Sequence, residues 1–388
     1  MKKFFLLCGV LIFWGSCKTS PTFVAVPFEP FEIRKIVEKG IQPVVIQAGK
    51  GVWPAVTYKE LSPLRLDAKK IKIAVLGDTG CRLKESHGKG SYQNCNLTQE
   101  WPFPEIVQSL VKESYDFAIH LGDYHYREQC SDKKLCSGYT NSIGYGWNAW
   151  WDDFYGPSQA LFKKSPVLLV RGNHEDCNRA YAGWGPISAG NKKFEDVCTE
   201  TEPYQWIEIG DLVFINFDNA AFEDRKPTPE KQKEKWIQAL REISNRITQL
   251  KSKKEIWFIA HKPVLGFVPV GAQQEPSAIG EYLKVLLEET GLVKKIDYIL
   301  AGHIHNQQLV FSQKDLLQII VGHSGAALDP FGHKITNKKM ISTTDSSSRF
   351  GYGLFERKSF KNWKFIFKDV KGKTDLSCTV RNKKINCR

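Results

Sequence analysis

Residues 71–80 read IKIAVLGDTG, and the same kind of pattern recurs along the chain. A short apolar run, Ile71–Leu76, is followed at once by the polar turn Gly77–Gly80. An apolar run of this length between polar loops is typical of a strand buried on both faces, as in a parallel sheet. Four more runs share this character, and they are Phe117–Leu121, Val167–Val170, Ile256–Ala260 and Ile296–Ala301.

Helices are expected between these strands. The clearest covers residues 229–251, with Thr228 as its N-cap and one apolar face at spacings of three and four. That face should pack in the core, and it consists of Trp236, Leu240, Ile243, Ile247 and Leu250. A second helix is predicted over residues 276–289, and Tyr204–Ile209 with Leu212–Phe217 should form a hairpin. Strands that alternate with helices indicate a layered α/β domain.

The composition is that of a globular protein. The 388 residues are 42% hydrophobic, 12% aromatic and 25% charged, which excludes a collagen, a coiled coil or a disordered tail. The net charge of +13 indicates an anionic substrate, partner or surface, but it carries no information about the fold. Length alone allows either one or two domains.

The N-terminus has the pattern of a signal peptide over residues 1–16. Lys2 and Lys3 precede an apolar run, Phe4–Trp14, that is too short to span a bilayer. Small residues before Cys17 resemble a bacterial lipobox, so we expect an exported lipoprotein anchored to the membrane through a lipid on Cys17. Cleavage near Ser20 and an uncleaved anchor or buried strand are the alternatives. No later stretch approaches the roughly 18 apolar residues of a spanning helix, so we expect any membrane attachment at the N-terminus.

Ten cysteines are many for a cytosolic enzyme. Without Cys8 in the signal peptide and Cys17 at the lipid site, eight remain, and an even number in an exported protein predicts disulfides. Proximity in the sequence favours the pairs Cys81–Cys95, Cys130–Cys136, Cys177–Cys198 and Cys378–Cys387. A zinc site is the weaker alternative, because the chain has no CxxC pair.

Polar segments follow the predicted strands, and together they offer carboxylate, amide, phenol and imidazole ligands. The segments are Gly77-Asp78-Thr79-Gly80, Gly122-Asp123-Tyr124-His125-Tyr126, Gly172-Asn173-His174-Glu175, Ala260-His261-Lys262 and Gly302-His303-Ile304-His305. Ligands of open α/β sheets gather at the carboxyl ends of the strands, where these segments should meet. Oxygen and imidazole donors in this mixture suit first-row metals such as iron, manganese or zinc.

This ordered set of motifs resembles the calcineurin-like metallophosphoesterases, and within them the purple acid phosphatases, over residues 71–325. The resemblance implies an α/β fold, a four-layer α/β/β/α sandwich, with the catalytic domain over residues 71–370. An N-terminal leader with an outer hairpin would occupy residues 17–70, and a basic tail with a disulfide residues 371–388. Phe258 stands where the fourth motif of the family usually has valine, and we expect only a packing difference.

The resemblance also implies a division of the ligands between two metals. The first would be held by Asp78, Tyr126 and His305, the second by Asn173, His261 and His303, and Asp123 would bridge them. Gly80 replaces the histidine of the commoner DxH motif, and Tyr126 would supply the missing ligand. Because a free phenol has a pKa of about 10, a bound phenolate favours Fe(III) at the first site. The second ion would be divalent iron, zinc or manganese.

The implied activity is hydrolysis of phosphate monoesters by a metal-bound hydroxide, on a small phosphorylated substrate and without nucleic acid. His174 would bind the phosphate or protonate the leaving oxygen, and its alternative is a structural histidine braced by Glu175. His125 and His87 are weaker candidates near the leaving group, and His120 should be a core histidine. A phosphodiesterase and a non-catalytic surface-binding lipoprotein are the alternative functions.

The segment from Arg127 to Pro166 is rich in aromatic residues and should form a long loop after a catalytic strand. These aromatic residues are Trp147, Trp150, Trp151, Phe154 and Tyr155. Two interpretations are open: the rings line the mouth of the substrate site, or they pack as a hydrophobic cluster under a disulfide-tied loop.

Overall fold

The computed structural model describes most of the chain from residue 30 onward. The described ranges are 30–49, 52–86, 89–139, 141–188, 198–224, 230–269, 277–311, 316–329, 349–382 and 384–388. The predicted signal peptide and Cys17 lie outside them, as do His87, Thr228 and the first residues of both predicted helices. Within the described ranges, no helix combines the length and the apolar character needed to cross a membrane.

Two large sheets form the centre of the fold. The ten-stranded sheet has the order β20 (Lys384–Cys387), β19 (Thr374–Arg381), β18 (Asn362–Asp369), β17 (Gly351–Ser359), β4 (Lys72–Leu76), β7 (Phe117–His120), β8 (Val167–Leu169), β1 (Phe31–Val37), β2 (Gly40–Gly49) and β3 (Val52–Tyr58). The six-stranded sheet has the order β15 (Gln307–Phe311), β16 (Leu317–Val321), β14 (Tyr298–Ala301), β11 (Glu255–Ile259), β10 (Leu212–Asn216) and β9 (Gln205–Ile209). Two small hairpins pair β5 (Leu83–Ser86) with β6 (Lys89–Tyr92) and β12 (Gly266–Val268) with β13 (Ser277–Ile279).

Each large sheet has a parallel centre. Strands β4, β7 and β8 run parallel in the first sheet, and β10, β11, β14 and β16 run parallel in the second. Antiparallel strands extend both sheets at their edges, among them the hairpin of β9 and β10 that the sequence predicts. The predicted buried runs are therefore confirmed as strands, and their carboxyl ends carry the polar motifs.

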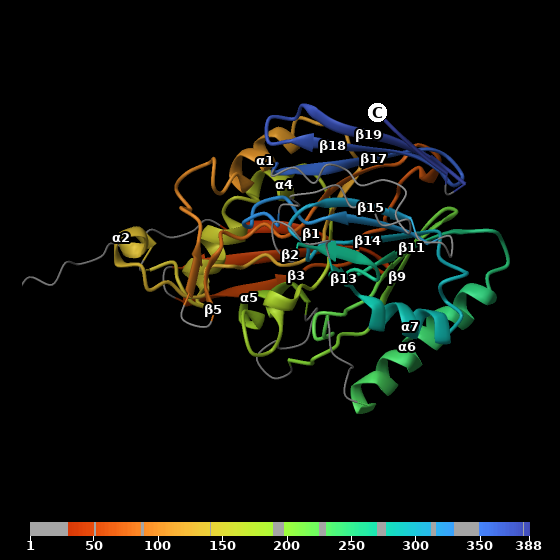
Figure 1. Cartoon of the computed structure of the whole chain (residues 1–388), viewed down its shortest axis with the longest axis horizontal. Helices are drawn as coiled ribbons and strands as arrows, with labels where there is room; N and C mark the ends of the chain where they lie inside the picture. The colour runs from red at the N-terminus through yellow and green to blue at the C-terminus, as the bar shows by residue number, and fades with distance from the viewer. Residues whose placement is uncertain are drawn as a thin grey trace, which may run out of the picture.

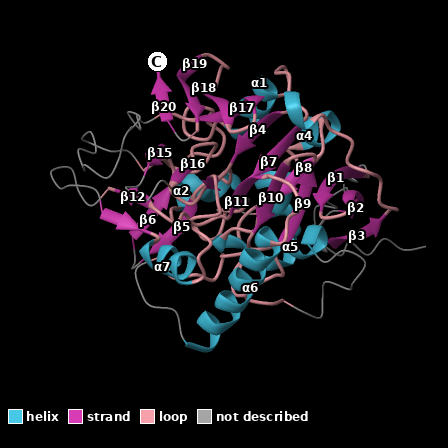
Figure 2. Ribbon diagram, turned by 90° about the vertical axis from the view of Figure 1, so that its right-hand side faces the viewer, coloured by secondary structure: helices cyan, strands magenta, loops and turns pink. Residues whose placement is uncertain are grey.

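Helices cover the outer faces of the two sheets. The helices are α1 (Phe103–Leu110), α2 (Lys133–Cys136), α3 (Trp147–Trp150), α4 (Gln159–Lys164), α5 (Tyr181–Ser188), α6 (Glu230–Thr248) and α7 (Glu281–Glu289). Helices α1 and α4 lie on the side of the ten-stranded sheet, and α6 and α7 on the opposite side of the molecule (Figures 1 and 2). One apolar cluster fills the space between the sheets, and two others lie beneath the helices. The predicted four-layer α/β/β/α sandwich is confirmed.

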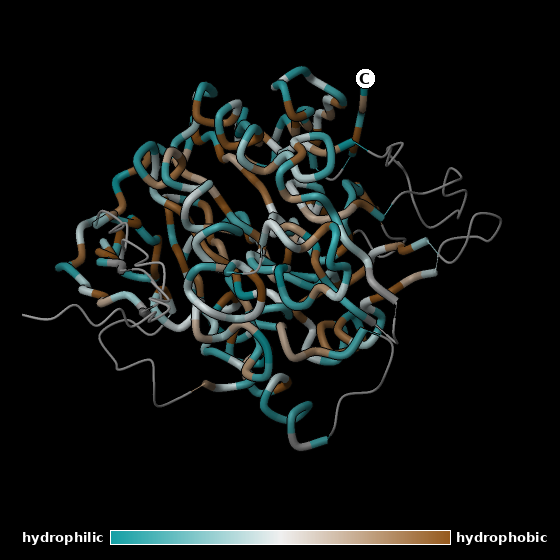
Figure 3. Tube along the Cα trace, turned by 90° about the vertical axis from the view of Figure 1, so that its left-hand side faces the viewer, coloured by the Kyte–Doolittle hydropathy of each residue, from teal (hydrophilic) through white to brown (hydrophobic). Residues whose placement is uncertain are grey.

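The hydrophobic residues concentrate in the strands of the interior, whereas many connecting turns are hydrophilic (Figure 3). The predicted apolar face of the long helix belongs to the core, since Trp236, Leu240 and Ile243 are buried and Ile247 and Leu250 are partly buried against them. This helix ends at Thr248, three residues earlier than its apolar pattern suggested.

The second helix begins later in the structure than the sequence predicts. Residues 277–279 form strand β13, in which Ile279 pairs with Gly266 of β12. The next residue, Gly280, has φ of +86°, a left-handed conformation that an α-helix interior does not contain. The helix therefore begins only at Glu281, because a local apolar pattern does not register a strand partner that lies elsewhere in the chain.

The aromatic loop packs into the core rather than at the mouth of a site. Trp147, Trp150, Phe154 and Tyr155 are all buried, and they belong to the cluster beneath α1 and α4. The interpretation of these four rings as a substrate-lining surface is therefore wrong. Trp151 is partly buried against the same cluster.

Disulfides close four local loops. All four predicted pairs are bonded, and they are Cys81–Cys95, Cys130–Cys136, Cys177–Cys198 and Cys378–Cys387. Near the N-terminus, the expected hairpin is the pair β1 and β2, which a third strand, β3, extends. Because β1 also pairs with β8, these strands are part of the ten-stranded sheet.

One buried carboxylate joins the two sheets. Glu255, at the start of β11, forms an ion pair of 3.1 Å with Arg357 of β17 and accepts a hydrogen bond of 2.7 Å from the backbone N–H of Lys361. The indole N–H groups of Trp257 and Trp363 also donate to this carboxylate. Removing one member of a buried ion pair is costly, because the charge of the other member is left uncompensated in the interior.

We therefore predict that Glu255→Gln lowers the free energy of unfolding by about 3 kcal/mol, because Arg357 loses its buried counter-charge. Denaturant unfolding followed by tryptophan fluorescence measures this change. The matched control is Glu208→Gln, which removes an exposed ion pair with Lys254 and should cost less than about 1 kcal/mol. Equal effects of the two substitutions would contradict the role given to Glu255.

Candidate metal centre

The polar motifs meet at the carboxyl ends of the parallel strands. Asp78 follows β4, Asp123 follows β7 and His303 follows β14. These three residues have φ of +56°, +55° and +70°, a left-handed conformation that is rare outside glycine. Backbone strain of this kind persists where the surrounding structure enforces it, and such places cluster at functional sites.

Two groups of donor atoms share one aspartate. Asp123 lies with His261 and His303 in one group and with Asp78 and His305 in the other, and the candidate ligand atoms of each group lie within 4.8 Å of one another. The position of Asp123 in both groups is the one that a bridging ligand requires. The structure thus brings together five of the seven predicted ligands as two adjacent clusters.

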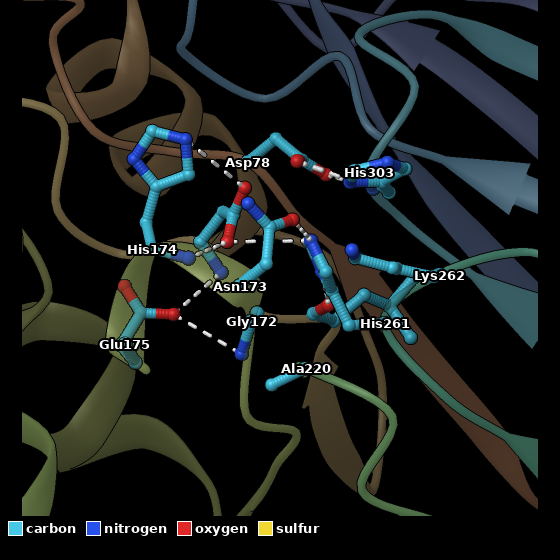
Figure 4. Close-up of polar contacts among 12 residues, drawn as sticks. Asp78, Gly172, Asn173, His174, Glu175, Ala220, His261, Lys262 and His303 are labelled. Carbon is cyan, nitrogen blue, oxygen red and sulfur yellow. Dashed lines mark hydrogen bonds and ion pairs between the residues drawn. The ribbon is translucent and has the colours of Figure 1, made fainter. Parts of the chain in front are cut away.

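The two remaining predicted ligands complete these clusters. The Tyr126 hydroxyl lies 2.6 Å from Asp123 Oδ2 and 2.8 Å from His305 Nε2. The Asn173 Oδ1 atom lies 3.0 Å from His261 Nε2, and the two side chains point toward each other (Figure 4). All seven predicted side chains therefore converge, Tyr126 on the first cluster and Asn173 on the second.

Each histidine of the site has one ring nitrogen bound to an oxygen outside the clusters. His261 Nδ1 lies 2.7 Å from the Leu121 carbonyl, and His305 Nδ1 lies 2.7 Å from the Ala327 carbonyl. His303 Nε2 lies 2.9 Å from Asp224. Such contacts determine which nitrogen carries the proton and leave the other free to bind a metal. The sequence did not identify Asp224, because it belongs to no motif.

The buried acidic groups of the site favour the binding of a cation. Burial and the neighbouring Asp123 carboxylate raise the pKa of Asp78 well above its ordinary value. Burial and Asp123 also raise the pKa of the Tyr126 phenol. Two buried carboxylates and a phenol this close together are compatible only if protons or metal ions offset their charge. The donors are two carboxylates, a phenol, an amide and three imidazoles, and this set fits two first-row metal ions.

The Glu175 carboxylate organises the backbone beneath the site. It accepts hydrogen bonds from the N–H groups of Asp123 at 2.9 Å, Tyr124 at 2.9 Å, His125 at 3.2 Å and Gly172 at 3.1 Å. One buried side chain thus joins the loop that contains Asp123 to the turn that contains Asn173. The expected alternative, in which Glu175 braces the His174 ring, is wrong.

His174 has other partners. Its Nδ1 atom lies 2.5 Å from Glu128 Oε1 and 2.8 Å from Arg179 Nη2, and its ring lies 3.8 Å from the ring of Tyr126. Its Nε2 atom faces Asp123 at 3.8 Å. Burial would raise the pKa of Glu128, but the hydrogen bond and charge of His174, together with Arg179, lower it to about 2. The sequence did not identify Glu128 or Arg179 as site residues.

Two further histidines in the described ranges, His120 and His125, have structural positions. His120 is buried and its Nε2 lies 2.9 Å from the Thr79 hydroxyl, as expected of a core histidine. His125 is also fully buried, with its ring beside Trp150, so it is enclosed in the core rather than exposed to a leaving group.

A family model matches residues 71–307, which is more than half of the chain, and it describes the calcineurin-like phosphoesterases. The chain belongs to the calcineurin-like phosphoesterase family. This family binds two metal ions. No curated protein sequence shows significant similarity to the chain.

Solved structures show the same fold. The purple acid phosphatase PPD1 of yellow lupin (Lupinus luteus) is 17% identical, with a TM-score of 0.50 over 88% of this chain. The match spans 60% of the lupin chain. The structure of PhoD is 10% identical, with a TM-score of 0.51 over 90% of this chain and 77% of the other. At these identities the likeness is one of fold alone.

We predict that Glu175→Gln lowers both the stability of the protein and the retention of metal at the centre. The amide nitrogen of glutamine would face two backbone N–H groups that now donate to one carboxylate oxygen, at a cost of roughly 2 to 5 kcal/mol in unfolding free energy. Thermal unfolding and metal content after dialysis measure both effects. Asp176→Asn, a change of the adjacent acid, should leave both near wild type. Wild-type metal retention in Glu175→Gln would contradict the organising role.

Proposed function

We propose that the protein hydrolyses phosphate monoesters at a centre of two metal ions, in the manner of a purple acid phosphatase. The first ion would be Fe(III), held by Asp78, Tyr126 and His305. The second would be divalent iron, zinc or manganese, held by Asn173, His261 and His303, with Asp123 between them. The observation that carries the proposal is the convergence of all seven donors around Asp123.

The choice of Fe(III) depends on Tyr126. Its hydroxyl lies between Asp123 and His305, and it would supply the ligand that Gly80, without a side chain, cannot. Burial disfavours the phenolate, so only a strongly polarising cation would stabilise it there. Trivalent iron meets this requirement better than zinc or manganese in their divalent states.

When bound, the two ions would activate a water molecule and neutralise the phosphoryl oxygens. His174 would act beside them. Its Nε2 atom faces Asp123, while Glu128 holds its Nδ1 atom. Arg179 Nη2 lies 3.0 Å from the same Nε2 atom. His174 would donate a hydrogen bond to the phosphoryl group or a proton to the leaving oxygen.

We further propose that the protein is exported and anchored in a bacterial membrane through a lipid on Cys17. The four disulfides support export, since such bonds persist in oxidising compartments.

The purified protein should contain two metal ions per chain and absorb visible light through a bond between Tyr126 and Fe(III). Tyr126→Phe should lose the absorption band, because the phenolate that donates the charge is gone. Metal analysis and visible spectroscopy measure the two properties, and Tyr139→Phe is the control, since this tyrosine instead hydrogen-bonds Asn94. A colourless, iron-free active enzyme would exclude Fe(III) but leave the phosphoesterase intact.

An aryl phosphate monoester and its bis-aryl diester distinguish the two ester classes. We expect the metal-loaded protein to hydrolyse the monoester with a kcat/KM at least about tenfold higher. His174→Asn should reduce hydrolysis by about 10²- to 10⁴-fold with both metals still bound, because proton transfer is lost. A preference for the diester would favour the phosphodiesterase. If neither ester is hydrolysed with both metals present, the proposal fails.

A further inference from the structure

Strand β5 runs directly alongside the segment that contains Tyr126. Leu83, its first residue, pairs in parallel with Arg127. The Leu83 N–H donates to the Tyr126 carbonyl at 2.9 Å, and the Glu128 N–H donates to the Leu83 carbonyl at 3.0 Å. The register between the two segments is therefore defined by two backbone hydrogen bonds.

This register determines which side chains share a face. Side chains alternate along a strand, and directly paired residues point to the same side. Leu83 and Arg127 point into the core, where both are buried. Tyr126 and Glu128 point the other way, because both touch His174. Arg82 and Lys84, which flank Leu83, therefore project on the face of the metal centre.

The electrostatic neighbours of the two cations agree with this placement. The charge of Arg82 acts on Tyr126 and on His305. Partial burial and then the charge of Arg179 lower the pKa of Lys84, and the charges of Glu128 and Asp123 also act on it. Both cations thus lie near the first cluster, on the side where His174 stands.

Neither cation is in ion-pair contact with an acidic side chain among the residues that the structure describes. Within that part of the chain, the Arg82 guanidinium and the Lys84 ammonium make no ion pair or side-chain hydrogen bond, and Arg82 Nε is buried without an acceptor. The neighbouring Arg179, by contrast, is already paired with Glu128. Two cationic side chains without an ion-pair partner favour the binding of an anionic ligand.

We propose that Arg82 and Lys84 form a subsite for a second anionic group of the substrate. The inference rests on the proposed function: the scissile phosphate would occupy the metal centre, and His174 would face the leaving oxygen. The subsite lies on the same side as His174, so it would receive a carboxylate or a second phosphate of the leaving alcohol. The substrate class is then a phosphate monoester of a small anionic alcohol.

The test uses pairs of substrates that differ only in this anionic group. One pair is 3-phosphoglycerate and glycerol 3-phosphate, which differ by a carboxylate in place of a hydroxymethyl group. The other is the bisphosphate and the monophosphate of 1,3-propanediol. For the metal-loaded wild type, kcat/KM should favour the anionic member of at least one pair by about tenfold, chiefly through KM. The pair with the larger ratio identifies the group as carboxylate or phosphate.

In Arg82→Gln/Lys84→Gln, this ratio should fall to about one. Lys84→Gln alone should lower the ratio in part, and this single variant replaces the double variant in the test if the latter does not fold. Lys112→Gln, an exposed lysine at the end of α1, should keep the wild-type ratio. A wild type that hydrolyses both members of each pair equally, or a double variant that keeps the ratio, overturns the subsite alone. Hydrolysis of no monoester overturns the proposed function as well.

Discussion

The carboxylate of Glu175 holds together the two loops on which the metal centre depends. Its oxygens accept the backbone N–H groups of Asp123, Tyr124 and His125 from one loop and of Gly172 from the other. The strained backbone of Asp123 is thereby held in place, and its side chain can lie between both ligand clusters. A single buried acid thus links sequence-distant strands and the chemistry above them.

Acidic groups lie at the centre of the site, and cationic side chains lie beside them. Asp78, Asp123 and Tyr126 form a buried acidic centre whose charge must be offset by protons or metal ions. Around it stand cationic side chains, Arg82 and Lys84 on one wall, which suit the anionic substrate rather than the metals. The net charge of +13 acts in the same direction at longer range, because it attracts anionic esters toward the protein.

Much of this arrangement could be predicted. Parallel strands place their carboxyl ends at one edge, so motifs that follow each apolar run were expected to meet, and they do. The disulfides followed from proximity along the chain. The second helix was misplaced because residues 277–279 pair with β12, and the aromatic loop proved to be core. The helix was misplaced because local patterns do not reveal distant partners, whereas the hydrophobic cluster was one of the two interpretations left open for the aromatic loop, and it is confirmed.

The sequence alone was enough to predict the types of candidate ligand, their order and the fold that brings them together, because each motif follows its own strand. The roles of Glu128, Asp224 and Arg179 emerged only from the folded chain, where they contact site residues from outside any motif. The orientation of Arg82 and Lys84 depends likewise on the pairing of Leu83 with Arg127. The physical reason is register: a shift of one residue would turn both cations away from the site.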